Sequence, residues 1–128
     1  KGTHRRIFIA RTDATRRRVG NMDELQRVFD RWDIEVVGLS ELSVREQVDL
    51  FSEVELVIGV HGAGLANIVY TYDAHVIELF GTQRPNTYAR LCEIMGVAYE
   101  HLTCAQHGIR VQVDTTRLEQ RLDGWAAR

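Results

Sequence analysis

The sequence predicts a doubly wound α/β fold, with a mostly parallel sheet and helices on both faces. Short apolar runs suited to buried strands alternate along the chain with stretches whose apolar residues recur at helical spacing. The connections between them are short, which is typical of βαβ units with right-handed crossovers. A length of 128 residues, 45% of them hydrophobic, suits one domain, so we expect a single domain over residues 1–128.

The first half of the chain is predicted to hold three strands, over residues 7–10, 35–38 and 56–60. A polar, arginine-rich loop over 11–20 follows the first strand. Asn21 is placed to cap a helix with apolar residues from Met22 to Trp32. Ser43 and Glu46 match a capping box at the start of the next helix. After the third strand, residues 65–70 can continue as a helix.

The second half is predicted to hold strands over 75–80 and 97–102, and a short one over 109–113. Asn86 is placed to cap a helix with one apolar face, and Gly96 suits its C-terminal end. Thr116 and Glu119 match a second capping box, opening a last helix that carries Leu118, Leu122 and Trp125 on one side.

Composition excludes several kinds of protein. A net charge of −2 gives no reason to expect nucleic-acid binding, and the apolar runs are too short to cross a bilayer. Two cysteines do not indicate a disulfide scaffold. His101, Cys104 and His107 are compactly spaced, but no fourth ligand accompanies them, so we expect no metal site.

The most informative stretch runs from the strand at 56–60 into His61, Gly62, Ala63 and Gly64, and then into residues that can form a helix. A glycine turn between a strand and a helix presents backbone N–H groups to an anion, and the glycines allow close approach. Taken alone, the glycines could serve only tight packing, with His61 as a surface residue. In open α/β sheets, however, ligands bind at the carboxyl ends of the strands, where His61 and Arg11 both fall.

Five blocks of the chain, in order, resemble the C-terminal half of glycosyltransferase family 61, also described as domain of unknown function 563. They cover roughly residues 5–102 and comprise Ile9-Ala10-Arg11 with Arg17-Arg18-Val19-Gly20-Asn21 and Glu24-Leu25, Ser43 to Val48 with Phe51, Gly59 to Asn67, Val76 to Leu79 with Tyr88, and Gly96 with Tyr99. Blocks in register are far more specific than a single motif.

The resemblance implies a GT-B glycosyltransferase, in which two Rossmann-like domains face each other across a cleft. This chain then corresponds to the donor-binding half, which takes a nucleotide-sugar, with a UDP-sugar expected. The N-terminal domain, absent here, would carry the acceptor site, so this chain alone is expected to be inactive. The acceptor would be a glycan or a protein, as in polysaccharide biosynthesis. Relatives act in the secretory pathway of eukaryotes or build microbial surface polysaccharides, so localisation stays open.

The resemblance also implies roles for individual residues. Without an Asp-x-Asp pair, metal-independent transfer is expected, and arginines with helix N-termini would neutralise the diphosphate. Arg11 and Arg17 are the predicted ligands, although a one-residue shift would exchange Arg17 for Arg18. The remaining predicted donor-binding residues are Gln47, His61, Gly62, Ala63, Gly64, Leu65, Asn67, Glu78 and Tyr88.

His61 is the candidate catalytic residue, and we expect its side chain to face the cleft mouth. Truncation there would weaken donor binding and change stability by no more than about 0.5 kcal/mol, as at surface sites. Glu78 alternates with Ile77 and Leu79, so it points to the opposite face of its strand.

Two other classes fit poorly. A nicotinamide dehydrogenase needs Gly-x-Gly-x-x-Gly after the first strand, where this chain has Arg11-Thr12-Asp13-Ala14. A phosphorylated signalling receiver needs a late lysine, and the only lysine is Lys1. The alternative that remains is a catalytically inactive nucleotide-binding or interaction domain of the same fold.

Overall fold

Five parallel strands form the main sheet in the computed structural model, which describes residues 5–10, 18–62 and 65–128. The spatial order is β3-β1-β4-β5-β6, with the strands at Glu35–Gly38, Arg5–Ala10, Val54–Val60, His75–Phe80 and Ala98–Thr103. All four neighbouring pairs are parallel. The predicted parallel sheet is therefore confirmed. Because the chain turns from β1 toward β3 on one side and later builds β4 and β5 on the other, the switch point lies between β1 and β4.

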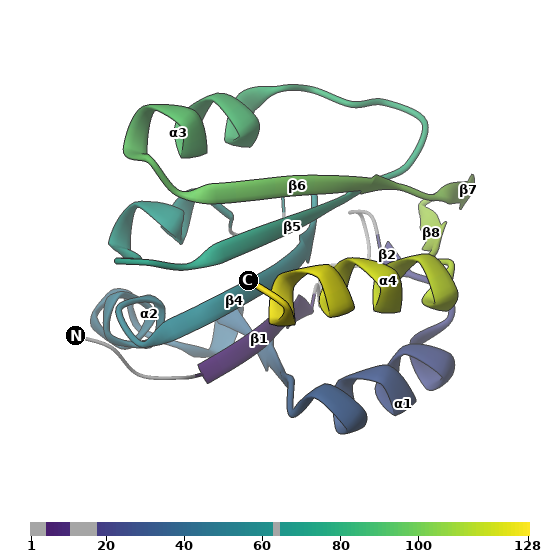
Figure 1. Cartoon of the computed structure of the whole chain (residues 1–128), viewed down its shortest axis with the longest axis horizontal. Coiled ribbons are helices and arrows are strands. Elements are labelled where there is room, and N and C mark those ends of the chain that lie inside the picture. The colour runs from purple at the N-terminus through teal and green to yellow at the C-terminus, as the bar shows by residue number, and fades with distance from the viewer. Residues whose placement is uncertain (1–4, 11–17, 63–64) are drawn as a thin grey trace.

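Helices cover both faces of this sheet (Figure 1), so the doubly wound prediction is also confirmed. On one face α1 (Met22–Trp32) and α4 (Thr115–Ala126) pack over the side chains of Phe8, Ile58 and Ile77. The other face is covered by α2 (Val44–Phe51), the 3-10 helix η2 (Leu65–Tyr70) and α3 (Thr87–Met95).

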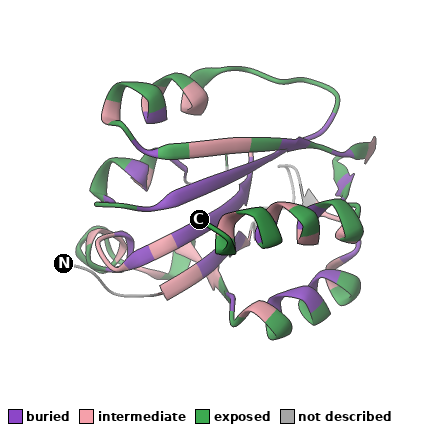
Figure 2. Ribbon diagram, in the orientation of Figure 1, coloured by how far each residue is buried: buried purple, intermediate pink, exposed green. Residues whose placement is uncertain are grey.

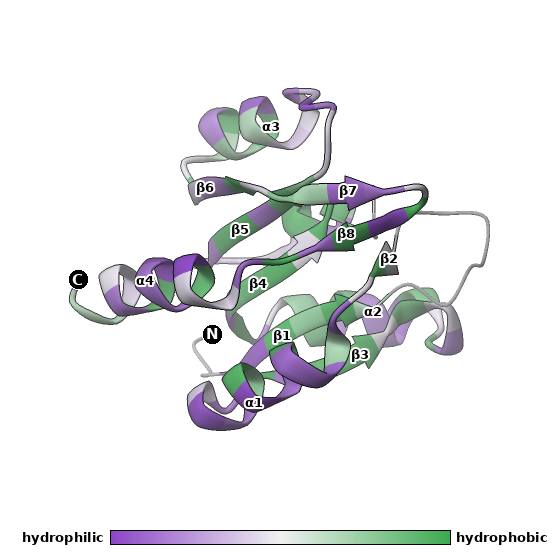
Figure 3. Cartoon of the chain, turned by 90° about the vertical axis from the view of Figure 1, so that its right-hand side faces the viewer, coloured by the Kyte–Doolittle hydropathy of each residue, from purple (hydrophilic) through white to green (hydrophobic). Residues whose placement is uncertain are grey.

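Alternation along the strands divides the core into two layers. In β1, Ile7 and Ile9 join the α2 side while Phe8 joins the α1 side. Burial is concentrated in the central strands (Figure 2), and β4 is almost wholly hydrophobic (Figure 3). Strands buried on both faces read as continuous apolar runs, which is why periodicity found them. Within the described ranges, no helix is long and apolar enough to span a membrane.

A second, three-stranded sheet has the order β2-β8-β7. It comprises Arg18–Val19, Arg110–Gln112 and Ala105–His107. The sequence predicted one strand over 109–113 and placed residues 18–19 in a loop, so this sheet was incompletely predicted. A hairpin turn with Gly108 at φ 63° joins β7 to β8. The short 3-10 helix η1 (Leu39–Glu41) follows β3.

The helix ends correct three of the predicted N-caps, at Asn21, Asn86 and Thr116, and confirm the Ser43 capping box and the Gly96 helix end. Ser43 and Glu46 form the predicted capping box. Asn21 occupies the N-cap position of α1, but its side chain makes no cap bond. Instead it exchanges two hydrogen bonds with the backbone of Val113, at 2.7 and 3.0 Å, and so ties α1 to the end of β8.

The final helix is capped by Asp114 and not by the predicted Thr116 box. The Asp114 carboxylate accepts from the N–H groups of Thr116 and Arg117. At α3, Asn86 holds the N-cap position without a side-chain cap bond, whereas Gly96 ends the helix with φ 74°, as predicted.

Candidate functional site

The turn after β4 lies at the carboxyl edge of the sheet, beside the switch point. The His61 N–H donates to the Leu79 carbonyl at 3.0 Å, which continues the β4–β5 ladder by one residue. Gly62 follows with φ 86°, a left-handed conformation that glycine adopts without strain. Ala63 and Gly64 lie outside the described residues. Leu65 begins η2 and is fully buried, so the turn is anchored at both ends.

The His61 side chain is largely enclosed, contrary to the prediction of a residue at the cleft mouth. Its Nδ1 lies 2.5 Å from Oε2 of Glu78. The imidazole also stacks on Phe80, with ring centroids 5.5 Å apart, and contacts the ring of Tyr88 at 5.3 Å. Only 20% of the side chain is exposed. The predicted position of His61 at the cleft mouth is therefore wrong, and truncation would remove one of the two hydrogen-bond partners of a buried carboxylate.

Glu78 is the buried centre of this arrangement. It points away from Ile77 and Leu79, as alternation predicts, but α3 and β6 residues cover that face and leave Glu78 with no exposed surface. Its Oε1 accepts from the hydroxyl of Tyr99 at 2.6 Å. Both carboxylate oxygens are thus bonded inside the protein, and Glu78 holds His61 instead of facing solvent.

Tyr99 and Cys92 remain protonated next to this carboxylate. Burial raises the pKa of Tyr99 far above its usual value, and its hydrogen bond to Glu78 raises it further. Burial, with the nearby charge of Glu78, raises the pKa of Cys92 to about 11. Tyr99 is therefore a permanent donor to Glu78, and Cys92 is a packing residue and not a nucleophile.

The hydrogen bond to Glu78 determines what His61 can do. A carboxylate accepts and does not donate, so the Nδ1 of His61 carries the proton. In neutral His61 the Nε2 is then an acceptor. In doubly protonated His61 the Nε2 becomes a donor, and the buried carboxylate stabilises the resulting positive charge.

The structure brings other predicted residues together in a second group. The Asn67 side-chain amide on η2 donates to Oε1 of Gln47 on α2, at 3.0 Å. Gln47 in turn donates to the carbonyls of Leu39 and Leu42. Asn67 and Gln47 thus lock η2 against α2 beneath the turn. Arg11 and Arg17 lie outside the described residues.

Tyr99 was given no role by the sequence, although it completes the hydrogen-bonded series from His61 through Glu78. It lies on β6, the neighbour of β5, and Val76 of β5 is its register partner. Registered residues in a parallel sheet share a face, so Tyr99 and Glu78 lie on the same side. The sequence signal that could have identified Tyr99 was a tyrosine in the following strand at a position that alternation places on the same face as Glu78.

The compact set of His101, Cys104 and His107 does not assemble into a cluster. His101 faces Phe80 and Arg84, with its ring 5.9 Å from that of Phe80. Cys104, three residues along the strand direction, is buried in the α1 and α4 layer. Over the described ranges no group of three or more histidine, cysteine and acidic side chains is arranged to hold a metal ion.

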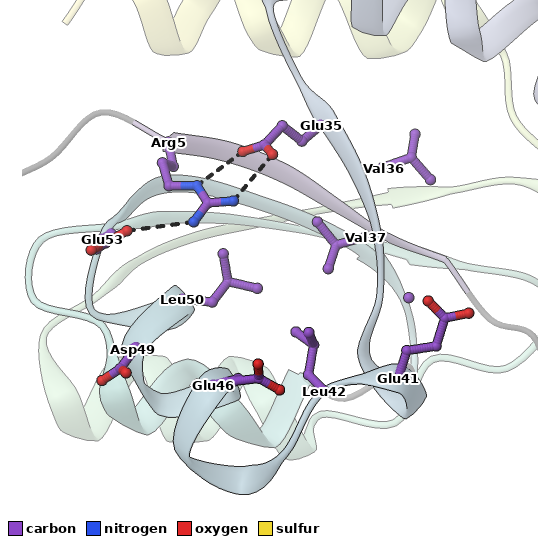
Figure 4. A pocket seen from close by; sticks show the side chains of 11 residues that line it. Arg5, Glu35, Val36, Val37, Glu41, Leu42, Glu46, Asp49, Leu50 and Glu53 are labelled. Atoms are coloured by element: carbon purple, nitrogen blue, oxygen red, sulfur yellow. Dashed lines mark hydrogen bonds and ion pairs between the residues drawn. The ribbon is translucent and has the colours of Figure 1, made fainter.

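A pocket of about 450 Å³ lies between the edge strand β3 and helix α2 (Figure 4). Val37, Leu42 and Leu50 form its apolar part. Arg5 lies at one end and binds Glu35 and Glu53, and the bond to Glu35 raises the pKa of its guanidinium. Five acidic residues line the pocket, namely Glu35, Glu41, Glu46, Asp49 and Glu53. Because they outnumber the single arginine, this pocket is unsuited to a nucleoside diphosphate.

Comparison with known proteins agrees with the resemblance of the sequence blocks. The family model of glycosyltransferase 61 matches residues 2–77, which is more than half of the chain. Similar curated proteins are EGF domain-specific O-linked N-acetylglucosamine transferases. The one from Drosophila melanogaster is 32% identical over 87 residues, covering 65% of this chain and 17% of the relative. Those from Mus musculus and Bos taurus are each 28% identical, covering 73% and 77% of this chain.

The chain covers only 17% to 20% of the length of these relatives. The matched family region contains β1, β4, the His61 turn and η2, and it ends one residue before Glu78. The fold therefore brings a residue from beyond that region into contact with His61.

Proposed function

Because the chain belongs to the glycosyltransferase 61 family, we propose that it is the part of a sugar transferase that binds the nucleotide-sugar donor. The observation that carries this proposal is the bond between His61 and the buried Glu78, at the carboxyl edge beside the switch point. A buried carboxylate that orients a partly exposed imidazole is a costly arrangement for a merely structural purpose.

His61 supports transfer through its Nε2 atom. In its neutral form it takes a proton from the attacking hydroxyl of the acceptor, and Glu78 stabilises the positive charge that results. In its doubly protonated form it donates a hydrogen bond to a phosphate oxygen of the donor, where negative charge accumulates as the sugar departs. Glu78 and Tyr99 act as positioning residues in both cases, because Glu78 has no exposed surface and both of its oxygens are bonded within the protein.

The diphosphate lies, in this proposal, at the glycine turn. Gly62 in its left-handed conformation lets backbone N–H groups turn toward an anion. Arg11 and Arg17 add positive charge, and no divalent metal takes part. The complete enzyme has a GT-B arrangement, and a second domain supplies the acceptor side of the cleft.

The donor is a UDP-sugar in this proposal, and the acceptor is a glycan or a protein. The curated relatives are named for O-linked N-acetylglucosamine transfer to EGF domains. UDP-N-acetylglucosamine is therefore the first donor to test. Without the opposing wall of the cleft, the isolated chain binds donor weakly and transfers nothing.

Titration calorimetry with UDP, GDP and CDP and with their sugars tests this function. We expect UDP and UDP-N-acetylglucosamine to bind, and His61→Gln to weaken that binding by about tenfold or more. His107→Gln, at an exposed imidazole on β7, is the matched control and should leave binding unchanged. Equal affinity of the His61 variant and the original chain would contradict the proposed role of His61.

A further inference from the structure

A second pocket, of about 320 Å³, extends from Phe80 at the carboxyl end of β5 along the first part of β6, where Tyr99 and His101 line it. Phe80 and Tyr99 form its aromatic walls, and the loop carrying Arg84 closes it above His101. This loop runs from β5 to α3 across β6 (Figure 1). Its Phe80 end reaches the carboxyl edge of the sheet, where ligands of α/β proteins bind, and neither the family match nor the predicted site residues include the residues of its polar rim.

The pocket is continuous with the candidate site because the two share their walls. The ring of Phe80 stacks on His61, with ring centroids 5.5 Å apart. It also contacts the ring of His101, at a centroid distance of 5.9 Å. The hydroxyl of Tyr99 bonds to Glu78, which holds His61. A ligand held at the turn would therefore meet this pocket directly across Phe80.

The polar rim of the pocket comprises Arg84, Asn86 and His101, of which Arg84 carries a permanent positive charge. Arg84 Nη1 lies 3.4 Å from Nε2 of His101. A guanidinium only donates, so His101 accepts from Arg84, and the charge of Arg84 is not neutralised by that contact. Asn86 also lines the pocket, and its side chain makes no cap bond to α3. Among the described residues that line the pocket there is no carboxylate.

The loop that carries Arg84 is fixed at its base. The Thr82 N–H and hydroxyl both bond to Oε1 of Gln106 on β7, at 2.8 and 3.2 Å. A Cβ atom at Gly81 would lie 1.9 Å from the same oxygen, so glycine is what allows Gln106 to reach the loop. Arg84 thus extends from a loop that is already anchored, which lowers the entropy lost on binding.

We propose that this pocket binds an oxyanion of the ligand whose other part lies at the His61 turn. This deepens the proposed function and rests on it for the identity of that ligand. Arg84 supplies the charge-assisted hydrogen bonds, and Phe80 and Tyr99 form the aromatic walls of the pocket beside it. Two groups carry the required chemistry, namely a phosphate of the nucleotide-sugar itself and the carboxylate of an acidic sugar.

Arg84→Gln tests the pocket, with Arg90→Gln as the matched control, since Arg90 is an exposed residue of α3 that does not line it. Each variant is titrated by ¹H–¹⁵N NMR with UDP, UDP-glucose, UDP-glucuronate, free glucuronate and inorganic phosphate. We expect Arg84→Gln to weaken binding by about 10- to 100-fold and Arg90→Gln to have no effect. The spectra themselves report whether each variant is folded.

The ligands separate the sources of the oxyanion. If Arg84→Gln loses affinity equally for all three nucleotides, the pocket binds a phosphate. If it loses affinity only for UDP-glucuronate, the pocket binds the sugar carboxylate. Undiminished binding of every ligand by Arg84→Gln overturns the proposal. If no nucleotide binds the original chain, the proposed function fails. The pocket then stands only if free glucuronate or phosphate shifts the amides of residues 84–89, 99 and 101 and Arg84→Gln abolishes those shifts.

Discussion

Replacement of His61 by alanine tests whether the Glu78 bond contributes to the fold. The change removes the donor to Oε2 of a carboxylate that has no exposed surface, and it leaves Tyr99 as its remaining partner. A buried acceptor that loses its partner costs about 1–3 kcal/mol. For a domain of 128 residues this lowers the melting temperature by roughly 3–15 °C.

Urea denaturation followed by circular dichroism measures this cost directly. His107→Ala, an exposed histidine, should change the free energy of unfolding by no more than about 0.5 kcal/mol. Adding Glu78→Gln to His61→Ala should cost little more, because a buried neutral amide is tolerated better than a lone carboxylate. If His61→Ala unfolds at the same urea concentration as the original chain, the bond to Glu78 contributes nothing and the surface interpretation of His61 is restored.

Two further predictions concern the helix cap of α4 and the charge cluster between α4 and strands β5 and β6. Asp114→Ala should destabilise the chain by about 1 kcal/mol while Thr116→Ala has no effect, because Asp114 is the cap, and equal effects in urea titrations would reject this assignment. Burial opposes ionisation of Glu100, but its hydrogen bonds to His75 and Arg121 outweigh burial and lower its pKa. Ionised Glu100 therefore stabilises the fold at pH values above its ordinary pKa near 4.5. That contribution is lost as the pH falls through the lower pKa that Glu100 has in the folded chain. Glu100→Gln should therefore flatten the fall of the urea midpoint below about pH 4.5, and an unchanged slope would contradict it.

The sheet and its helices could be predicted because each depends on local patterns. Strands such as β4 are buried on both faces and read as apolar runs, and the helices between them show one apolar face. The turn at Gly62 and the helix end at Gly96 could also be predicted, because both positions have a positive φ, which favours glycine. The Ser43 box was correct because both of its partners lie within one helical turn.

Where the sequence failed, a distant partner decided the outcome. Asn21 is a residue type that often caps helices, but its side chain instead forms hydrogen bonds with the backbone of Val113, 92 residues away in the sequence. His61 was expected at the surface because nothing local reveals that β5 places Glu78 beside it, with Gly59 as the register partner of Glu78. Alternation gave the face of Glu78 correctly, whereas its burial depends on how α3 and Tyr99 cover that face.

Metal-independent binding of a nucleoside diphosphate at the His61 turn is the central claim, and calorimetry of the chain with UDP in the presence of EDTA tests it most directly. We expect saturable binding with EDTA present. Gly62→Val should weaken it, because a β-branched residue is strained at φ 86° and would distort the turn. Gly124→Val, in open space on α4, is the control for the same substitution away from the turn. Binding that requires magnesium or manganese, or that Gly62→Val leaves intact, would contradict the account.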